Sequence, residues 1–223
     1  MGSDGSAVRR VVSLGDETGP TWSADSRSIA FGRVGGVWVV RADGTALRRL
    51  TREAHSPAWS PGGRWIAFDD GRDVVAISPD GRRRALVATP RVDDAYHVYL
   101  APAWSRDGER LAFSIAAAPD TISLGGIGIV SRFGGPVTRI SLANASFPDW
   151  SPSGRKLAVA IYGKQGGSTI ATVELRTGRV RTLRSGTVPR WSPDGRSIAF
   201  ADDGQIYVMD ANGSNPRQLT SAS

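Results

Sequence analysis

The sequence predicts an all-β fold, a β-propeller of four-stranded antiparallel blades. Three observations predict it: an internal repeat with five copies, a turn motif that recurs in these copies, and the lack of long segments with helical periodicity. The copies read GPTWSADSRSIAF, SPAWSPGGRWIAF, APAWSRDGERLAF, FPDWSPSGRKLAV and VPRWSPDGRSIAF, beginning at residues 19, 56, 101, 147 and 188. Their tryptophans follow one another at steps of 37, 45, 46 and 41 residues, the period of a propeller blade.

Turn chemistry divides each copy into four short strands, here called a to d. Strand a is the Pro-x-Trp-Ser segment, and a turn of the Ser-Pro-Asp-Gly type joins it to strand b. In the last copy, strands b, c and d are expected at residues 197–200, 206–209 and 217–220. Blades stack face to face, so we expect the five tryptophans, Trp22, Trp59, Trp104, Trp150 and Trp191, to pack between blades.

The repeat count predicts one domain over residues 1–223, with blade cores starting near residues 20, 57, 102, 148 and 189. Residues 4–11, DGSAVRRV, match residues 43–50, DGTALRRL, in register. The chain therefore starts with an outer strand d that lacks its own strands a to c. The prediction is five complete blades plus this orphan N-terminal strand; the alternative is a segment of a six-bladed propeller.

Composition excludes several classes of function. The chain has 223 residues, 40% of them hydrophobic, without an apolar run long enough for a membrane span, so no membrane insertion is expected. It has no cysteine, which excludes disulfides, thiolate metal sites and cysteine nucleophiles. The net charge is +7, and nearly all of the positively charged residues are arginines. This charge by itself favours no particular class of binding partner. The N-terminus lacks the apolar core of a secretion signal, so the compartment is left open.

Catalytic motifs are missing as well. The sequence has no G-x-S-x-G, P-loop, G-x-G-x-x-G or H-E-x-x-H motif, and its two histidines are His55 and His97. We therefore expect no enzyme activity, no cofactor and no metal. The acidic pairs at residues 69–70, 93–94 and 202–203 are expected in solvated loops, and the arginine run at 82–84 on a solvated edge rather than a nucleic-acid surface.

Loop lengths predict one binding face. The a–b turns are short and uniform, whereas the d–a connection after Leu86 and the b–c connections of the third and fourth copies are long, and all of these fall on one side of the disc. The candidate partner-binding residues on this side are Arg91, Asp93, Asp94, Tyr96, His97, Tyr99, Tyr162 and Lys164. The segment from Ala116 to Gly126 is expected to be a flexible loop. Alternatively, these segments are ordered connections that only cover the core.

The position between proline and tryptophan in strand a varies among copies. It holds Thr21, Ala58 and Ala103 in the first three and the charged Asp149 and Arg190 in the last two. The two charged residues are predicted to lie near the central channel. They form either a pair between neighbouring blades or polar contacts to a ligand at the channel mouth.

The last copy, PRWSPDGRSIAF followed by IYVMDANGSNPRQLT, resembles the TolB-type (WD40-like) β-propeller repeat family, and the resemblance covers nearly the whole chain. It implies a propeller, usually six-bladed, of the kind used in bacterial envelope interaction proteins and as the non-catalytic domain of some larger enzymes and regulators. A periplasmic or extracytoplasmic location rests on this resemblance alone. We therefore expect a monomeric, non-catalytic module that binds a protein or peptide and no nucleic acid. The alternative is a sensor or accessory domain of a larger peptidase or regulator.

Overall fold

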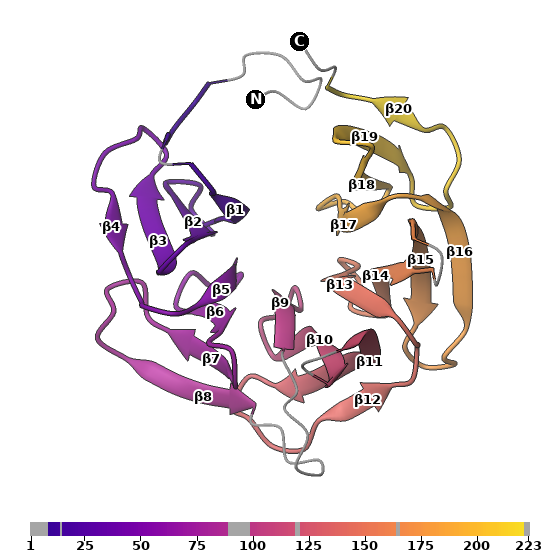
Figure 1. Ribbon diagram of the computed structural model, residues 1–223, viewed down its shortest axis with the longest axis horizontal. Coiled ribbons are helices and arrows are strands. Elements are labelled where there is room, and N and C mark those ends of the chain that lie inside the picture. Colours follow the sequence, from indigo (N-terminus) through magenta and orange to yellow (C-terminus); the bar gives the residue numbers. More distant parts are fainter. Residues whose placement is uncertain (1–8, 14, 89–98, 119–120, 164–165, 221–223) are drawn as a thin grey trace.

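The computed structural model describes residues 9–13, 15–88, 99–118, 121–163 and 166–220, and it confirms the all-β propeller. The described residues form 20 strands and no helix, grouped in five four-stranded antiparallel sheets. Figure 1 shows the five sheets as blades around a central axis, with β1, β5, β9, β13 and β17 innermost. The described part of the chain accordingly contains no helix long and apolar enough to cross a membrane.

Each blade is an up-and-down meander whose strands follow one another in sequence. Blade 1 consists of β1 (Thr18–Trp22), β2 (Ser28–Arg33), β3 (Gly36–Arg41) and β4 (Arg48–Arg49). Blade 2 consists of β5 (His55–Trp59), β6 (Ile66–Asp69), β7 (Val74–Ile77) and β8 (Arg84–Ala88). Blade 3 consists of β9 (Tyr99–Trp104), β10 (Arg110–Ala118), β11 (Thr121–Ser131) and β12 (Thr138–Ile140). Blade 4 consists of β13 (Ala145–Trp150), β14 (Lys156–Tyr162), β15 (Ser168–Glu174) and β16 (Val180–Ser185). Blade 5 consists of β17 (Thr187–Trp191), β18 (Ser197–Asp202), β19 (Gln205–Asp210) and β20 (Arg217–Gln218).

The a–b turn is closed by a side-chain cage that its sequence supplies. In blade 3 the Ser105 hydroxyl donates to Asp107 Oδ1 at 2.5 Å, and the Glu109 backbone N–H donates to the same oxygen at 3.0 Å. These hydrogen bonds stabilise the carboxylate, so the pKa of Asp107 lies below its ordinary value. Blades 1 and 5 repeat this cage with their own Ser and Asp.

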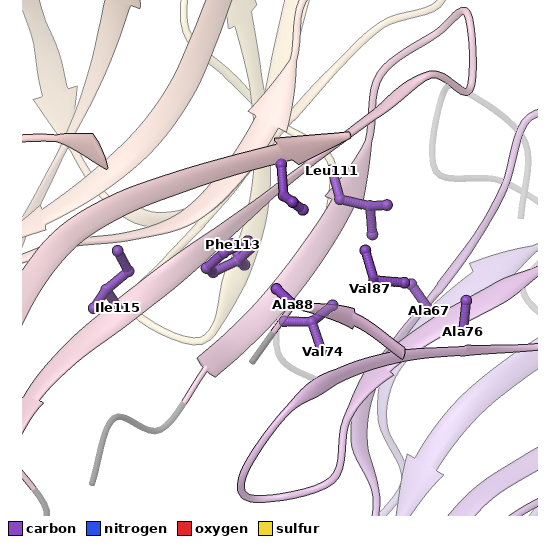
Figure 2. Close-up of a cluster of buried hydrophobic side chains, with 9 residues drawn as sticks. Ala67, Val74, Ala76, Val87, Ala88, Leu111, Phe113 and Ile115 are labelled. Atoms are coloured by element: carbon purple, nitrogen blue, oxygen red, sulfur yellow. The ribbon is translucent and has the colours of Figure 1, made fainter. Parts of the chain in front are cut away.

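Hydrophobic clusters lie between the blades rather than within them. Four clusters bridge the four contacts from blade 1 to blade 5, one for each pair of successive blades. Figure 2 shows the cluster between blades 2 and 3, where Val74 and Val87 face Leu111 and Phe113. Alanine recurs in the middle of strand b, as at Ala67 and Ala112, which lets neighbouring sheets approach closely.

The repeat tryptophans end the inner strands as predicted, but their burial differs. Trp150 is 5% exposed, and its indole N–H donates to the Ala103 carbonyl of the preceding blade at 3.0 Å. Trp104 makes the equivalent bond to Ala58. Trp22, in contrast, is 56% exposed. The expectation that all five pack between blades is therefore wrong for Trp22, because among the described residues no blade packs on this side of blade 1.

Two other expectations are corrected. The segment expected as a flexible loop from Ala116 to Gly126 instead extends β10 and β11, apart from residues 119–120, which lie outside the described residues. Asp69, expected in a solvated loop, is the last residue of β6 and is only 2% exposed. The first difference arises within blade 3, where the ends of β10 and β11 pair with each other. The second depends on what packs against β6, which the local sequence does not specify.

Candidate binding channel

The inner strand of every blade is bent directly before its proline. The residue at this position has a left-handed φ near +50°, in the order Gly19 (54°), Ser56 (50°), Ala101 (53°), Phe147 (51°) and Val188 (50°). The pairing of the inner strand with strand b shifts register at the same place in all five blades, which marks a β-bulge. Such a backbone is strained for Phe147 and especially for the β-branched Val188. All five bends line one cavity, so the strain is concentrated at the channel wall.

Two cavities follow one another along the axis. The upper cavity, of about 450 Å³, is lined by inner-strand residues of all five blades and lies toward the d–a connections. The lower cavity, of about 550 Å³, is lined by the ends of inner strands and by the a–b turns. Pro61, Trp104 and Asp149 line both cavities. These shared residues mark the level at which the two cavities meet.

The lower cavity has a mixed wall in which aromatic rings and prolines alternate with polar side chains. Three repeat tryptophans, Trp104, Trp150 and Trp191, line it together with prolines of the a–b turns and Arg106. Sequence reasoning assigned these tryptophans to packing alone and did not predict that they also line a cavity. The signal was available, because the Trp-Ser segment connects the inner strand directly to the a–b turn at the axis.

Asp149 is the acidic group of the channel. Its Oδ2 accepts a hydrogen bond of 2.6 Å from the backbone N–H of Trp191 in the next blade. Burial raises the pKa of Asp149 to about 6, against the opposing effects of the positive charge of Arg190 and of this hydrogen bond. The carboxyl group therefore changes its charge close to neutral pH.

Arg190 holds the same repeat position one blade further on and lines the same upper cavity. It is exposed, and its Nη1 donates to its own neighbour, the Pro189 carbonyl, at 3.0 Å. Within the described part of the chain no salt bridge joins it to Asp149. The upper cavity thus presents one acidic and one basic side chain that are not paired with each other.

The same repeat position in blade 1 shows the structural side of this arrangement. Thr21 Oγ1 accepts from the backbone N–H of Trp59 at 3.3 Å, just as Asp149 does from Trp191. One hydrogen bond to the next blade is therefore a role that a neutral threonine can fill. A carboxylate adds a charge that this role does not need.

Of the predicted loop-face residues, the structure describes Tyr99 and Tyr162. The others, Arg91, Asp93, Asp94, Tyr96, His97 and Lys164, lie outside the described residues. Tyr99 begins β9 and pairs with Ile115 of β10. Tyr162 ends β14, and its hydroxyl lies 3.0 Å from Thr187 Oγ1 of blade 5. Asp149 and Arg190 are thus the two predicted site residues that the described structure brings into one cavity.

Asp69 is a further buried carboxyl that sequence reasoning missed. Its Oδ1 accepts from the Gly71 backbone N–H at 3.2 Å, while its Oδ2 is buried without a hydrogen-bond partner. Burial raises its pKa to about 7. Among the residues that the structure describes, no three histidine, aspartate or glutamate side chains are grouped so that they could hold a metal ion.

Comparison with known proteins agrees with the propeller fold. A family model described as the TolB beta propeller domain matches residues 80–223. A search of curated proteins found no match to this chain.

Solved structures share the fold at low sequence identity. TolB from Acinetobacter baumannii superimposes with a TM-score of 0.77 at 19% identity, over 95% of this chain and 56% of that one. A gluconolactonase from Xanthomonas campestris gives a TM-score of 0.71 at 18% identity, over 91% and 74% of the two chains. A puromycin-hydrolyzing peptidase from Mycobacterium tuberculosis gives 0.65 at 17% identity, over 91% and 37%. The chain thus spans little more than half the length of the Acinetobacter protein.

Proposed function

The chain belongs to the TolB β-propeller domain family, and from this premise we propose that it is a non-catalytic module that binds an extended polypeptide segment in its central channel. The observation that carries the proposal is the placement of Asp149 and Arg190. Both line the upper cavity and are not paired with each other. A peptide supplies donors and acceptors for both along one extended backbone.

The shape of the channel supports a chain rather than a compact ligand. Cavities of about 450 and 550 Å³ meet at the level of Asp149, so an occupant can run along the axis past this carboxyl group. The tryptophans and prolines of the lower cavity offer flat apolar surfaces, which suit proline or aromatic side chains of a peptide. Polar contacts inside the channel would set the direction in which the peptide chain runs.

The absence of catalytic motifs supports a binding role over an enzymatic one. In the sequence no nucleophile motif is present, and the candidate channel combines one carboxyl, arginines and aromatic residues. A second candidate function, an accessory domain of a larger peptidase, is favoured by one observation. The propeller matches only 37% of the length of the puromycin-hydrolyzing peptidase, so this fold also occurs as one part of a longer hydrolase chain.

Peptide selection tests the proposal. We would select peptides on the immobilised full chain from a phage-displayed random library and measure the Kd of a selected peptide by fluorescence anisotropy. Asp149→Asn and Arg190→Ala should each weaken binding by roughly 10-fold or more, because each removes a charge-assisted hydrogen bond. Matched controls are Asp203→Asn and Arg196→Ala, which change exposed residues that line neither cavity.

The loop face provides the competing outcome. If Tyr96→Ala and Tyr99→Ala abolish binding while Asp149→Asn and Arg190→Ala leave it unchanged, the long loops bind the peptide and the channel proposal is wrong. A chain that selects no peptide above the background of an unrelated propeller also contradicts it.

A further inference from the structure

A hollow separate from the central channel lies at the outer part of the boundary between blades 2 and 3. This outer hollow has a volume of about 180 Å³, and its lining includes Trp65, Ala85, Leu86, Trp104, Arg132 and Phe133. An adjoining hollow of about 320 Å³, toward the a–b turns, shares Trp65, Trp104 and Arg132 with it. Of these residues, only Trp104 also lines the channel cavities. The outer hollow is therefore a second concave surface of the propeller.

Two strongly exposed apolar side chains border the outer hollow. Leu86 lies in β8 and is 58% exposed, and Phe133 lies in the c–d turn between β11 and β12 and is 78% exposed. This turn packs directly on β8, because a β-carbon at Gly134 would lie 3.2 Å from the carbonyl oxygen of Val87. Apolar side chains from two blades are thereby held beside one hollow, which is typical of an interaction site.

The internal repeat shows that these apolar residues are particular to this boundary. Leu86 pairs with Val75 of strand c. The residues at the same register in the other four blades are polar, namely Arg49, Arg139, Thr182 and Gln218. At the position of Trp65, before the apolar triplet of strand b, the other copies have Ser28, Arg110, Lys156 and Ser197. At the position of Phe133, before the turn glycine, blades 1, 2 and 5 have Asp43, Asp80 and Asn212. A blade therefore folds without apolar side chains at these three positions.

Two unpaired arginines flank the outer hollow. The Arg83 guanidinium lies 5.3 Å from the centre of the Trp65 ring, and Arg64 lines the adjoining hollow. Both arginines are exposed, and neither forms an ion pair within the described part of the chain. Arg132, in contrast, is already paired, because its Nε lies 3.0 Å from Glu109 Oε2. Arg64 and Arg83 thus offer two guanidinium groups to carboxylates of a partner.

We propose that the outer hollow is a docking site for an acidic peptide segment of a protein partner. One large apolar side chain of the segment enters between Leu86 and Phe133, and its carboxylates pair with Arg64 and Arg83. A cavity of about 150 Å³ accommodates a benzene molecule, so a hollow of about 180 Å³ has room for one phenylalanine or leucine side chain. A buried apolar anchor surrounded by charged contacts is the usual arrangement of a binding hot spot.

Charge and ring geometry disfavour two other occupants. A second copy of the chain would bring the same arginines and a net charge of +7 to this surface. A nucleic acid would stack its bases on open aromatic faces. The rings of Trp65 and Phe133 already have guanidinium groups over them, Arg83 at 5.3 Å and Arg132 at 4.1 Å from the ring centres.

Peptide selection with depletion tests this proposal. Phage-displayed random peptides are first depleted on the full chain with Leu86→Arg and Phe133→Asp, which retains the channel, and are then selected on the unsubstituted chain. Both substitutions introduce residues that other blades have at these positions, so the thermal unfolding midpoint should stay nearly unchanged. The Kd of each enriched peptide is measured by fluorescence anisotropy.

Enriched peptides should combine aspartate or glutamate with one large apolar residue. Leu86→Arg alone, Phe133→Asp alone and the double variant Arg64→Ala/Arg83→Ala should each raise the Kd about 10-fold or more. A loss with Leu86→Arg, which adds positive charge, separates the apolar contact from general attraction of an acidic peptide.

Matched controls change similar residues elsewhere. Val34→Asp alters a side chain that is 77% exposed, Val180→Arg alters the outer strand of blade 4, and Arg196→Ala changes the residue at the repeat position of Arg64. These variants should leave the Kd unchanged. Asp149→Asn should also leave it unchanged, so failure of this proposal and failure of the channel proposal are distinguishable.

Several results would overturn the proposal. They are the enrichment of no peptide, the enrichment of peptides without acidic residues, and equal losses with the control variants. A dimer of the chain that Phe133→Asp dissociates would show that a second copy occupies the hollow. Binding of labelled single-stranded oligothymidine that Leu86→Arg abolishes would show that a nucleic acid does.

Discussion

Asp69 occupies a position that other blades fill with small residues. The residue after the apolar triplet of strand b is Gly32, Ser114, Ala160 or Ala201 elsewhere. Ser114 at this position accepts a hydrogen bond of 3.1 Å from the Phe147 backbone N–H of the next blade. Asp69 is equally buried but leaves Oδ2 unpartnered, so this carboxyl group destabilises the fold when it is ionised.

Asp69→Ser should therefore stabilise the protein in a pH-dependent way. The pKa of Asp69 is about 7 in the folded state against 3.8 as the ordinary value. Between these values the folded state holds a proton that the unfolded state has released, so stability falls as pH rises through this window. At pH 8 the variant should gain about 2–4 kcal/mol of unfolding free energy in urea titrations, and near pH 4.5 much less.

The control is Asp203→Asn, which removes an exposed carboxylate of blade 5 and should change the free energy of unfolding little at either pH. An Asp69→Ser variant destabilised equally at both pH values would show that the carboxylate has a stabilising partner.

The repeat tryptophans should contribute unequally to stability. Trp150→Ala removes a side chain that is 5% exposed together with its bond to Ala103, so it should cost about 3–5 kcal/mol. Trp22→Ala removes a side chain that is 56% exposed and should lower the free energy of unfolding by less than about 1 kcal/mol. Chemical denaturation of both variants measures the difference. Similar losses would mean that Trp22 is covered in solution.

At the scale of elements, the sequence was sufficient where local chemistry decides the structure. The repeated Pro-x-Trp-Ser segment places all five inner strands and the a–b turns that follow them, and the same register identifies Asp149 and Arg190 as channel residues. The sequence was insufficient for features that depend on contacts with other strands. The lengths of β10 and β11 and the burial of Asp69 depend on what pairs or packs with them, which no local pattern records.

The a–b turn of blade 4 offers a test of the turn cage. Ser153 stands where the turns of blades 1, 3 and 5 have aspartate, and its contacts are longer, 3.2 Å to the Ser151 hydroxyl and 3.4 Å to the Arg155 N–H. Ser153→Asp should restore the cage and raise the unfolding midpoint by a few degrees. The cage lowers the pKa of its aspartate, as for Asp107, so the gain should be present above pH 4 and lost as pH falls below it. A midpoint unchanged at pH 7 would contradict this role.

At the scale of the whole molecule, the propeller behaves as a curved array whose end blades each have one neighbour. Blades 2, 3 and 4 share a hydrophobic cluster on both faces, whereas blades 1 and 5 share one on a single face among the described residues. In such arrays stability is the sum of each unit and its contacts with its neighbours. The end blades therefore lack about one interface each.

Hydrogen exchange should reveal this asymmetry. Backbone amides in β2, β3, β18 and β19 are hydrogen-bonded like those of the central blades, yet local opening of an end blade breaks only one interface. We expect these amides to exchange faster than those of β10, β11, β14 and β15 when deuterium uptake is followed by mass spectrometry under native conditions. The comparison uses central strands of each blade, because inner and outer strands differ in solvent exposure for other reasons. Uniform protection in all five blades would mean that blades 5 and 1 are closed against each other in solution, since only a closed ring gives every blade two neighbours.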